Sequence, residues 1–254
     1  MFPSTRWYRT FPVLFGALLS ACAGAGPGAS FDARDPYEQS NRDIHDFNVA
    51  MDTAVLRPVA QGYDVVTPTL FQHMIGNDFD QIDTLNDFLN FTLQGEMEPA
   101  GQAFGRLFVN TVLGAGGLLD PATEFGLDSQ DTDFGVTLGK YGVEEGAFLM
   151  LPFFGPSTPR DLGGMAGDLA MDPFTYGGVF NSDILNILSP VLSVVDIVDR
   201  RNRNAATIDE ILYESPDSYV ALRSIYLQRR DKLILGDEAA TEALPDIFDD
   251  EPVN

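Results

Sequence analysis

The sequence has little of the side-chain chemistry on which catalytic and metal sites depend. Its 254 residues include one cysteine, two histidines and one tryptophan. It contains no His-Glu-x-x-His motif, no paired Cys-x-x-Cys and no Gly-x-Ser-x-Gly nucleophile elbow. His45 and His73 both fall on predicted helices, where a histidine is usually an ordinary surface or core residue. The sequence therefore favours a non-enzymatic protein with no cofactor and no metal site.

Positive charge and long apolar runs are also scarce. Only 15 lysines and arginines face 38 aspartates and glutamates, which gives a net charge of −23 at pH 7. This balance argues against nucleic acid and against capture by anionic lipid headgroups, because both depend on clustered basic side chains. Beyond the N-terminal segment, no stretch has the 18 uninterrupted apolar residues of a conventional spanning helix. Any contact with a bilayer must therefore come from shorter amphipathic helices.

The N-terminus is a predicted export signal for a lipoprotein. Arg6 and Arg9 precede an apolar run over residues 11–19, and the tetrapeptide LSAC that ends at Cys22 fits the lipobox. We expect residues 1–21 to be removed and Cys22, the only cysteine, to carry the lipid. Their removal takes away two arginines and no acid, so the net charge changes from −23 to −25. Ala23 after the cysteine favours sorting to the outer membrane rather than retention at the inner one.

Four segments are expected along the chain. Residues 1–21 are the signal peptide, and residues 22–34, which are rich in glycine and alanine, form a flexible tether. Residues 35–236 form one all-α domain of short amphipathic helices. Residues 237–254 form an acidic tail with two prolines, which predicts disorder.

Apolar periodicity and capping residues predict the helices of this domain. Arg57-Pro58 should end or bend the first helix, and Asn77 is a plausible cap within the second helical region. Ser189-Pro190 should start a helix that ends with three arginines. The predicted spans are 37–56, 68–75, 77–94, 98–113, 158–169, 181–188, about 190–203 and about 217–235.

Two of these helices carry apolar stripes at helical spacing. The stripe in 77–94 consists of Phe79, Ile82, Leu85, Leu89 and Leu93, and aspartates mostly avoid it. The helix 98–113 carries Phe104, Leu107, Phe108, Val112 and Leu113. Such stripes usually face a protein core, and this is the expectation for 77–94.

A glycine-rich apolar stretch, FGVTLGKYGVEEGAFLMLPFFGPSTPRDLGG, occupies residues 134–164. Its composition predicts a bent, packed loop, followed by a helix that starts with Thr158 as N-cap and Pro159 in the first turn. Gly139, Gly142 and Gly146 are candidate hinges of a mobile hairpin-like loop, although static turns would explain them equally well. The candidate residues of this gating loop or lipid passage are Gly139, Tyr141, Gly142, Gly146, Phe148, Leu151, Phe153 and Phe154.

The same stretch resembles a known signature. FGxTLGxYGV followed by LPFFGPSTPRDxGG is similar to the VacJ/MlaA outer-membrane lipoproteins of Gram-negative bacteria. Ser40 departs from the pattern, which usually has an aromatic residue there. The resemblance runs in order from Asp35 to Ile234, with further pieces at Asp35-Pro36-Tyr37-Glu38, Asn41-Arg42, Phe47-Asn48, Arg57-Pro58-Val59, residues 91–95, residues 106–117, Asp217-Ser218-Tyr219 and residues 226–230.

The resemblance implies a fold and a function. The fold would be a helical ring seated in the outer membrane, lipid-anchored and facing the periplasm, with a passage for phospholipid. The protein would remove phospholipids misplaced in the outer leaflet and pass them to a periplasmic carrier, and it would associate with a trimeric porin. We further expect the first helix to act as a lock on the ring through Phe47 and Asn48.

Two alternatives from other classes remain open at this point. A lipid-anchored periplasmic hydrolase would need a nucleophile and a base, and the missing motifs argue against it. A structural or surface-interaction lipoprotein would need no internal passage. Asp128, Asp131 and Asp133 resemble half of a calcium loop, but without its central glycine and closing glutamate they are better explained as turn and cap residues.

Overall fold

The computed structural model describes residues 34–171 and 183–236. The predicted signal peptide, Cys22, nearly all of the tether and the predicted acidic tail lie outside these residues. The elements run in the order α2 (Glu38–Met51), a π-helical turn η2 (Asp52–Leu56), α3 (Arg57–Val66), α4 (Thr69–Gln94), α5 (Met97–Val112), α6 (Pro121–Glu124), α7 (Phe134–Lys140), β1 (Leu149–Leu151), β2 (Gly155–Ser157), α8 (Pro159–Met171), α10 (Asp183–Arg203), α11 (Ala205–Asp209), a second π-helical turn η4 (Glu210–Glu214) and α12 (Ser218–Leu235).

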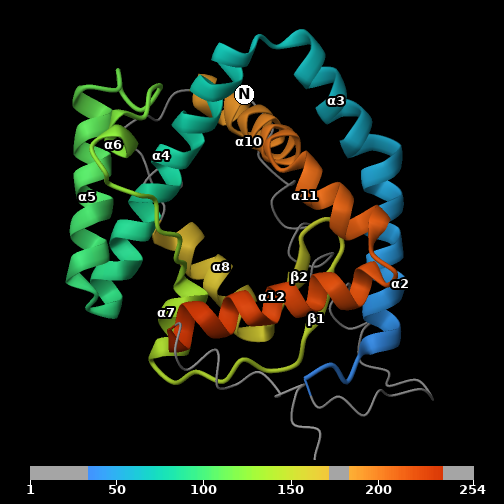
Figure 1. Cartoon of the computed structure of the whole chain (residues 1–254). Coiled ribbons are helices and arrows are strands. Elements are labelled where there is room, and N and C mark those ends of the chain that lie inside the picture. Colours follow the sequence, from blue (N-terminus) through green and yellow to red (C-terminus); the bar gives the residue numbers. More distant parts are fainter. Residues whose placement is uncertain (1–33, 172–182, 237–254) are drawn as a thin grey trace, which may run out of the picture.

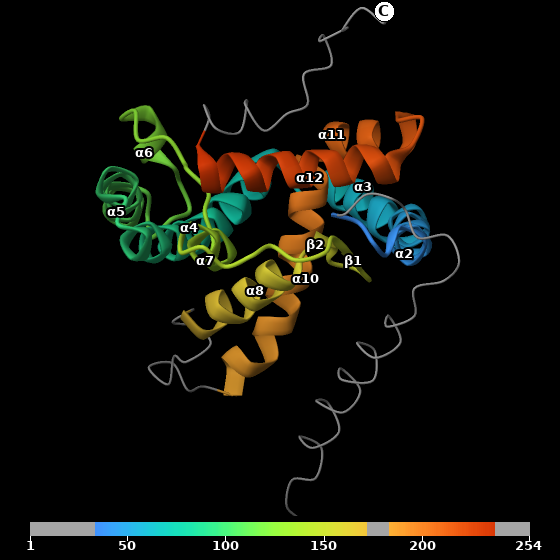
Figure 2. The same ribbon diagram turned by 90° about the horizontal axis from the view of Figure 1, so that it is seen from below.

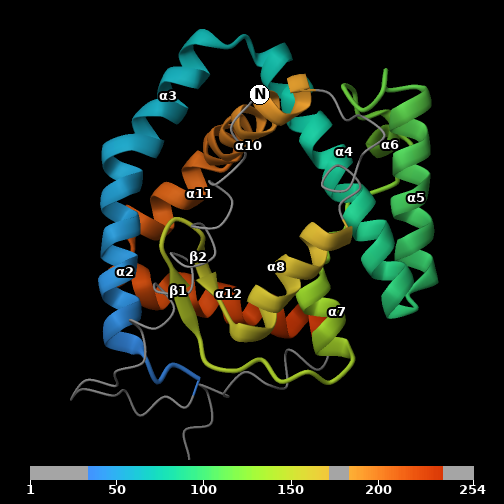
Figure 3. The ribbon, with the colours of Figure 1, turned by 180° about the vertical axis from the view of Figure 1, so that it is seen from behind.

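The helices are arranged as a ring. In Figure 1, α2 with α3, then α4, and then α12 form three sides of a frame, and α10 runs from one corner into it. The helix α5 lies along the outside of α4, as Figure 3 also shows from behind. Figure 2 shows α11 and α12 on one face of the frame, with α8 and the start of α10 extending from the other face. The expected mostly helical single domain with a small hairpin is confirmed.

The hairpin lies later in the chain than the sequence indicated. Strands β1 and β2 are antiparallel, with Leu149 opposite Ser157 and Leu151 opposite Gly155. The connection between them contains Phe153, whose φ of 67° is unusual for a residue with a side chain. The expected hinge at Gly139 instead lies inside α7, a helix that Asp133 caps by accepting a hydrogen bond from the Val136 amide. A Cβ at Gly139 would come within 2.7 Å of Ile234, so the glycine there permits close packing rather than a turn.

Helical structure continues through three positions at which the sequence indicated a helix boundary. Pro58 does not end the first helical region, because a π-helical turn directly before it continues the chain into α3. Asn77 caps no helix; α4 runs through it, and its amide donates to the Leu118 carbonyl instead. Likewise α10 runs without interruption through Ser189 and Pro190.

Two predicted helix starts are confirmed. Thr158 caps α8, since its hydroxyl accepts a hydrogen bond from the Asp161 amide at 3.2 Å. Asp217 caps α12 in the same way by accepting from the Val220 amide. These caps fix where the two helices that border the hairpin begin.

An apolar core lies between the hairpin and α12. Phe148 and Met150 from β1 and its approach pack against Tyr219 and Leu227 of α12, and all four are buried. The rings of Phe148 and Tyr219 meet edge to face with centroids 6.1 Å apart. This cluster joins segments about seventy residues apart in the chain.

The helix α4 buries its polar face rather than its apolar face. Its buried residues include Gln72, Thr84, Asp87 and Asn90, with Phe91 as the one large apolar member. The predicted core stripe of α4 is only partly covered, and Leu93 is exposed. The expectation that this stripe faces a protein core is met only in part, since Phe79, Ile82, Leu85 and Leu89 are half-buried and none of them is fully buried.

The same inversion continues on α5. Its buried residues are Ala100, Ala103, Arg106 and Asn110, whereas Phe104, Phe108, Val112 and Leu113 are exposed. Phe108 retains 60% of its accessible surface. Among the described residues, buried polar side chains outnumber buried apolar ones, the reverse of an ordinary water-soluble core.

Candidate functional site: a charged cavity inside the ring

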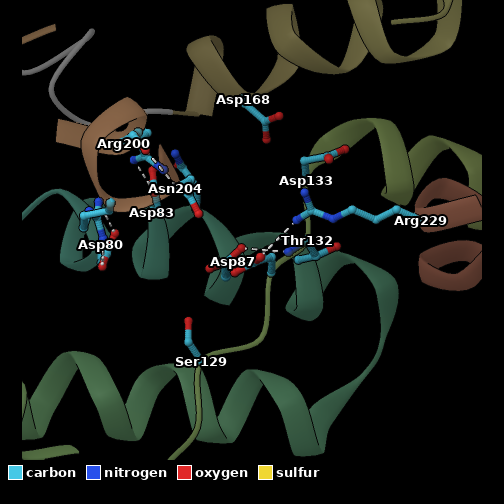
Figure 4. A pocket seen from close by; sticks show the side chains of 13 residues that line it. Asp80, Asp83, Asp87, Ser129, Thr132, Asp133, Asp168, Arg200, Asn204 and Arg229 are labelled. Atoms are coloured by element: carbon cyan, nitrogen blue, oxygen red, sulfur yellow. Dashed lines mark hydrogen bonds and ion pairs between the residues drawn. The ribbon is translucent and has the colours of Figure 1, made fainter. Parts of the chain in front are cut away.

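A cavity of about 490 Å³ opens between α4, α8, α10, α12 and the segment that precedes α7. Figure 4 shows its side chains converging from these elements, with Asp87 near the middle, Arg200 and Asp83 on one side and Arg229 with Asp133 on the other. The residues that line it are Asp80, Asp83, Asn86, Asp87, Ser129, Asp131, Thr132, Asp133, Asp168, Arg200, Arg203, Asn204 and Arg229.

Ion pairs across the cavity fix its walls. Arg200 of α10 lies 2.6 Å from Asp83 of α4, and Arg203 lies 2.9 Å from Asp80 one turn away. These side chains are about a third to a half exposed, so each pair contributes at most about 1 kcal/mol to stability. Their effect is to set the position of α10 against α4. Arg229 of α12 holds the exposed Asp131 at 3.0 Å in the same manner.

The lining carries an excess of negative charge. It includes six aspartates and three arginines, so fully ionised it would have a net charge of −3. Asp80, Asp83 and Asp87 belong to α4, Asp168 belongs to α8, and Asp131 and Asp133 belong to the segment before α7. An apolar chain would find no partner on this surface, whereas a charged or zwitterionic group would.

Asp87 is the least exposed of these carboxylates, at 5% of its accessible surface. One of its oxygens accepts a hydrogen bond from the Thr132 amide at 2.9 Å. Burial raises the pKa of Asp87 to about 7, and the charges of Asp131, Asp83 and Asp133 add to this increase, against the opposing effect of the Thr132 hydrogen bond. Asp87 therefore exchanges a proton near neutral pH.

Beside the cavity, Asn90 organises a buried polar cluster. Its amide nitrogen donates to Asp168 at 2.9 Å, and its amide oxygen accepts from the Thr137 hydroxyl at 2.9 Å. Asp168 also accepts from the Phe134 amide at 3.1 Å. Burial raises the pKa of Asp168, although the hydrogen bonds from Asn90 and Phe134 oppose the increase. The cluster joins α4, α7 and α8 through hydrogen bonds.

The predicted lock residues contact the hairpin. The ring of Phe47 on α2 meets that of Phe153 edge to face, with centroids 5.3 Å apart. The amide of Asn48 donates to the Leu151 carbonyl at 2.9 Å and accepts from the Phe153 amide at 2.8 Å. Two turns earlier on the same helix, Asn41 makes the same kind of paired contact.

Asn41 bridges the other end of β1. It donates to the Phe148 carbonyl at 3.0 Å and accepts from the Met150 amide at 2.9 Å. Together with Asn48, it supplies the hydrogen bonds that a third strand would otherwise make to β1. The hairpin thus depends on α2 for its backbone hydrogen bonds as well as for packing.

The remaining predicted loop residues lie in different surroundings. Phe148 is fully buried in the apolar core, whereas Phe153 and Phe154 at the hairpin tip are each 72% exposed. Tyr141 is exposed and its hydroxyl donates to the Leu93 carbonyl at 2.6 Å. Gly142 and Gly146 have φ values of 85° and 79°, which L side chains rarely adopt. None of these residues lines the charged cavity.

The sequence does not identify the residues that line the cavity, because the aspartates of residues 77–94 are recognisable there only as residues that mostly avoid the apolar stripe. Asp80, Asp83 and Asp87 recur at spacings of three and four, so they share one face of α4. Three like charges on one face are mutually repulsive, and this was the available signal that counter-charges face them. Arg200 and Arg203, expected to stabilise a helix end, are those counter-charges.

Two further structural observations bear on the site. Within the part of the chain that the structure describes, no helix combines the length and apolar character needed to cross a membrane. Over the same residues, no group of histidine, cysteine, aspartate and glutamate side chains is arranged so that it could hold a metal ion.

Comparison with known proteins gives concordant results. A family model described as MlaA lipoprotein matches residues 33–233. The chain is 34% identical over 225 residues to the intermembrane phospholipid transport system lipoprotein MlaA of Haemophilus influenzae, covering 84% of this chain and 86% of that protein. It is 31% identical over 236 residues to the protein of that name from Escherichia coli, covering 90% and 89% of the two chains.

A solved structure agrees with the sequence comparisons. A chain from work on the structural basis for maintenance of bacterial outer membrane lipid asymmetry superposes with a TM-score of 0.65 at 32% identity, covering 79% of this chain and 98% of that one. The protein therefore falls into a class of mostly helical lipoproteins with a small two-stranded hairpin. It belongs to the MlaA lipoprotein family.

Proposed function

We propose that this protein is an outer-membrane lipoprotein that removes misplaced phospholipids from the outer leaflet and passes them to a periplasmic carrier, which maintains the lipid asymmetry of the membrane. The observation that carries the proposal is the inversion of the ring: a charged cavity lies inside and large apolar side chains lie outside. Family membership supports it independently, since relatives are named for intermembrane phospholipid transport.

The inversion suits an amphiphile. A phospholipid that leaves a bilayer must keep its charged headgroup solvated while its acyl chains stay among apolar groups. The charged cavity provides the first environment. The exposed side chains of α5, among them Phe104 and Phe108, would bury apolar area in hydrocarbon, at about 25 cal/mol per Å² removed from water.

The mode of attachment follows from the same features. Cys22 would carry the lipid anchor, and the amphipathic helices would seat the ring in the bilayer with one face toward the periplasm. The partners of this proposal are phospholipid, a periplasmic lipid carrier and a trimeric porin that would hold the ring in place. Nucleic acid is not among the partners.

The hairpin and α2 would gate the passage. Phe47 and Asn48 hold the hairpin tip through one ring contact and two hydrogen bonds. Breaking these few contacts would release the tip from α2. Gly142 and Gly146 lie between α7 and β1 in left-handed conformations, where they could absorb a rotation of the hairpin. In this proposal Phe153 and Phe154 cover the passage rather than line it, and Phe148 anchors the hairpin.

The test of the function measures phospholipid in the outer leaflet of cells with the gene, without it, and with the gene restored. Loss of the protein should raise outer-leaflet phospholipid and sensitivity to detergent or chelator, and restoration should reverse both. An unchanged outer leaflet in a clean deletion would contradict the proposal and favour a structural lipoprotein without a passage. Cys22→Ser should fail to restore the barrier, since a hydroxyl cannot carry the lipid through a thioether.

The test of the gate compares Asn48→Leu with Asp46→Asn, an exposed neighbour on α2 with no hydrogen bond that the structure shows. Asn48→Leu should alter outer-leaflet phospholipid at normal protein abundance, because the hairpin tip loses both hydrogen bonds. Asp46→Asn should behave as wild type. Equal amounts of outer-leaflet phospholipid in the two variants would contradict a role of α2 in gating.

A further inference from the structure

Asp87 and Asn86, adjacent on α4, both line the charged cavity and both have an oxygen without a partner. One oxygen of Asp87 accepts from Thr132, and among the described residues no donor lies within hydrogen-bonding distance of the other. The amide oxygen of Asn86 is buried and has no hydrogen-bond partner among those residues. A buried acceptor without a donor, such as the Asn86 oxygen, is rare in folded proteins because it loses its hydration without replacement, whereas the second Asp87 oxygen is not among the buried atoms and is open to the cavity.

The charges around these two oxygens select the kind of donor that would fit. Three carboxylates, those of Asp83, Asp131 and Asp133, lie close enough to Asp87 to raise its pKa. The arginines of the cavity are already engaged with carboxylates. A small cation with several N–H groups would satisfy both acceptors and offset the negative charge, whereas an anion would be repelled.

We propose that this corner of the cavity binds the primary ammonium group of a phospholipid headgroup, so that the passage prefers phosphatidylethanolamine to anionic phospholipids. This inference rests on the proposed function and specifies its substrate. The ammonium would donate to Asp87 and Asn86, and the headgroup phosphate would then lie toward Arg229, the most exposed arginine of the lining. Two of the three ammonium N–H groups have acceptors in this arrangement, Asp87 and Asn86, whereas a quaternary ammonium has no N–H to donate.

The preference should depend on pH. Asp87, whose pKa burial raises to about 7, holds a proton below that pH and becomes a carboxylate above it. An ammonium competes with that proton, so binding of phosphatidylethanolamine should strengthen from pH 6 to pH 8. The charged groups that face Asp87 are Asp83 of α4, Asp131 and Asp133 of the segment before α7, Asp168 of α8, Arg200 and Arg203 of α10 and Arg229 of α12.

The test titrates the purified lipidated protein in detergent with three dihexanoyl phospholipids and measures heat of binding. Phosphatidylethanolamine should bind about tenfold more tightly than phosphatidylglycerol, which corresponds to about 1.4 kcal/mol, and phosphatidylcholine should lie between them. Asp87→Asn should weaken binding of the ethanolamine lipid about fivefold to tenfold and should not weaken binding of the glycerol lipid, because the anionic lipid loses a repulsive charge. The matched control is Asp78→Asn, which removes the same charge from an exposed position on the same helix outside the cavity.

A second variant keeps the inference testable if Asp87→Asn does not fold. Asp131→Asn removes one charge from the exposed side of the cavity and should reduce the same preference by a smaller factor. Equal affinity of the wild type for the ethanolamine and glycerol lipids would overturn this inference and leave the proposed function intact. An equal loss for both lipids in Asp87→Asn would also overturn it. If none of the three lipids bound, the proposed function itself would lose its support.

Discussion

The region formed by α2, the hairpin and α12 and the region formed by α4 and α5 are built on opposite rules. In the first, apolar rings such as Phe148 and Tyr219 meet in a buried cluster, and polar groups sit around it. In the second, Asn90, Arg106 and Asn110 are buried beside a small apolar cluster of Phe91, Ala100 and Ala103. Large apolar residues of α5, Phe104 and Phe108 among them, face outward. One chain therefore contains a water-type core and an inverted one.

The comparison separates a region that buries its apolar surface within the chain from a region that leaves its apolar surface exposed. The hydrophobic effect stabilises the hairpin region within the chain itself. In the α4–α5 region, the apolar area is still exposed after folding, and its burial is left to the surroundings. The hydrogen bonds of that region fix its geometry in the meantime, because a buried polar group without a partner costs about 1–3 kcal/mol.

The largest expected effect tests the water-type core. Phe148→Ala should lower the free energy of unfolding by about 3–5 kcal/mol, because it leaves a cavity among Met150, Tyr219 and Tyr226. Thermal or denaturant unfolding in detergent measures the change. Phe108→Ala is the matched control from the inverted region and should shift the same quantity by no more than about 0.5 kcal/mol. Equal losses would contradict the distinction between the two regions.

The next effect tests the polar interior. Asn90→Leu keeps the volume but removes the acceptor of the Thr137 hydroxyl and one of the two donors to the Asp168 carboxylate, which still accepts from the Phe134 amide. We expect a loss of about 2–4 kcal/mol in unfolding free energy, since two buried groups lose a hydrogen bond. Asn77→Leu on the same helix, which loses one contact to a carbonyl, should cost under about 1 kcal/mol. A neutral Asn90→Leu would mean that apolar packing also sustains this region.

A smaller effect concerns pH. Because burial raises the pKa of Asp87 to about 7, above the value of 3.8 for an ordinary aspartate, its stabilising contribution is full below pH 4 and is lost as pH rises toward 7. Asp87→Asn should remove that loss, so the variant should gain on the order of 2 kcal/mol over wild type between pH 5 and pH 8. Asp78→Asn should show no such gain. Unfolding curves at both pH values measure it.

The smallest change in stability should accompany the largest change in bilayer contact. Replacing Phe104 and Phe108 by serine should leave unfolding in detergent within about 0.5 kcal/mol for each site. The same change should reduce insertion into phospholipid vesicles, which quenching of a probe on α5 by brominated lipid would report. A loss of thermal stability without a change in quenching would place these side chains in an internal core instead.

Much of the fold could be predicted from the sequence because its signals are local. Thr158 and Asp217 act at the helix starts where their side chains predict them, and the amphipathic periods locate most helices. Pro58 and Asn77 misled because their meaning depends on context: a π-helical turn accommodates the first, and a distant carbonyl takes the second. Periodicity also shows which residues of α4 share its apolar face, but it does not show whether that face points toward the interior of the ring or away from it.

The cavity could not be predicted for a related reason. Whether Asp80 and Asp83 face water or a protein interior depends on Arg203 and Arg200, which lie more than a hundred residues later in the chain. No signal in the sequence near either aspartate indicates these ion pairs. The glycines indicated a bent segment between residues 139 and 146, but the hairpin itself lies at residues 149–157. The fully buried position of Phe148 follows from its contact with α12, again far along the chain.

The asparagine contacts of α2 affect how readily the chain aggregates before it has folded. A two-stranded sheet leaves outer edges on which another chain can add a strand, and such edges are starting points for aggregation. Asn41 and Asn48 occupy backbone groups at both ends of β1, so that edge is blocked only once α2 has docked. The helix α2 precedes the hairpin by about a hundred residues, so it is synthesised first. The exposed edge of β1 can therefore be covered by α2 as soon as the strand forms.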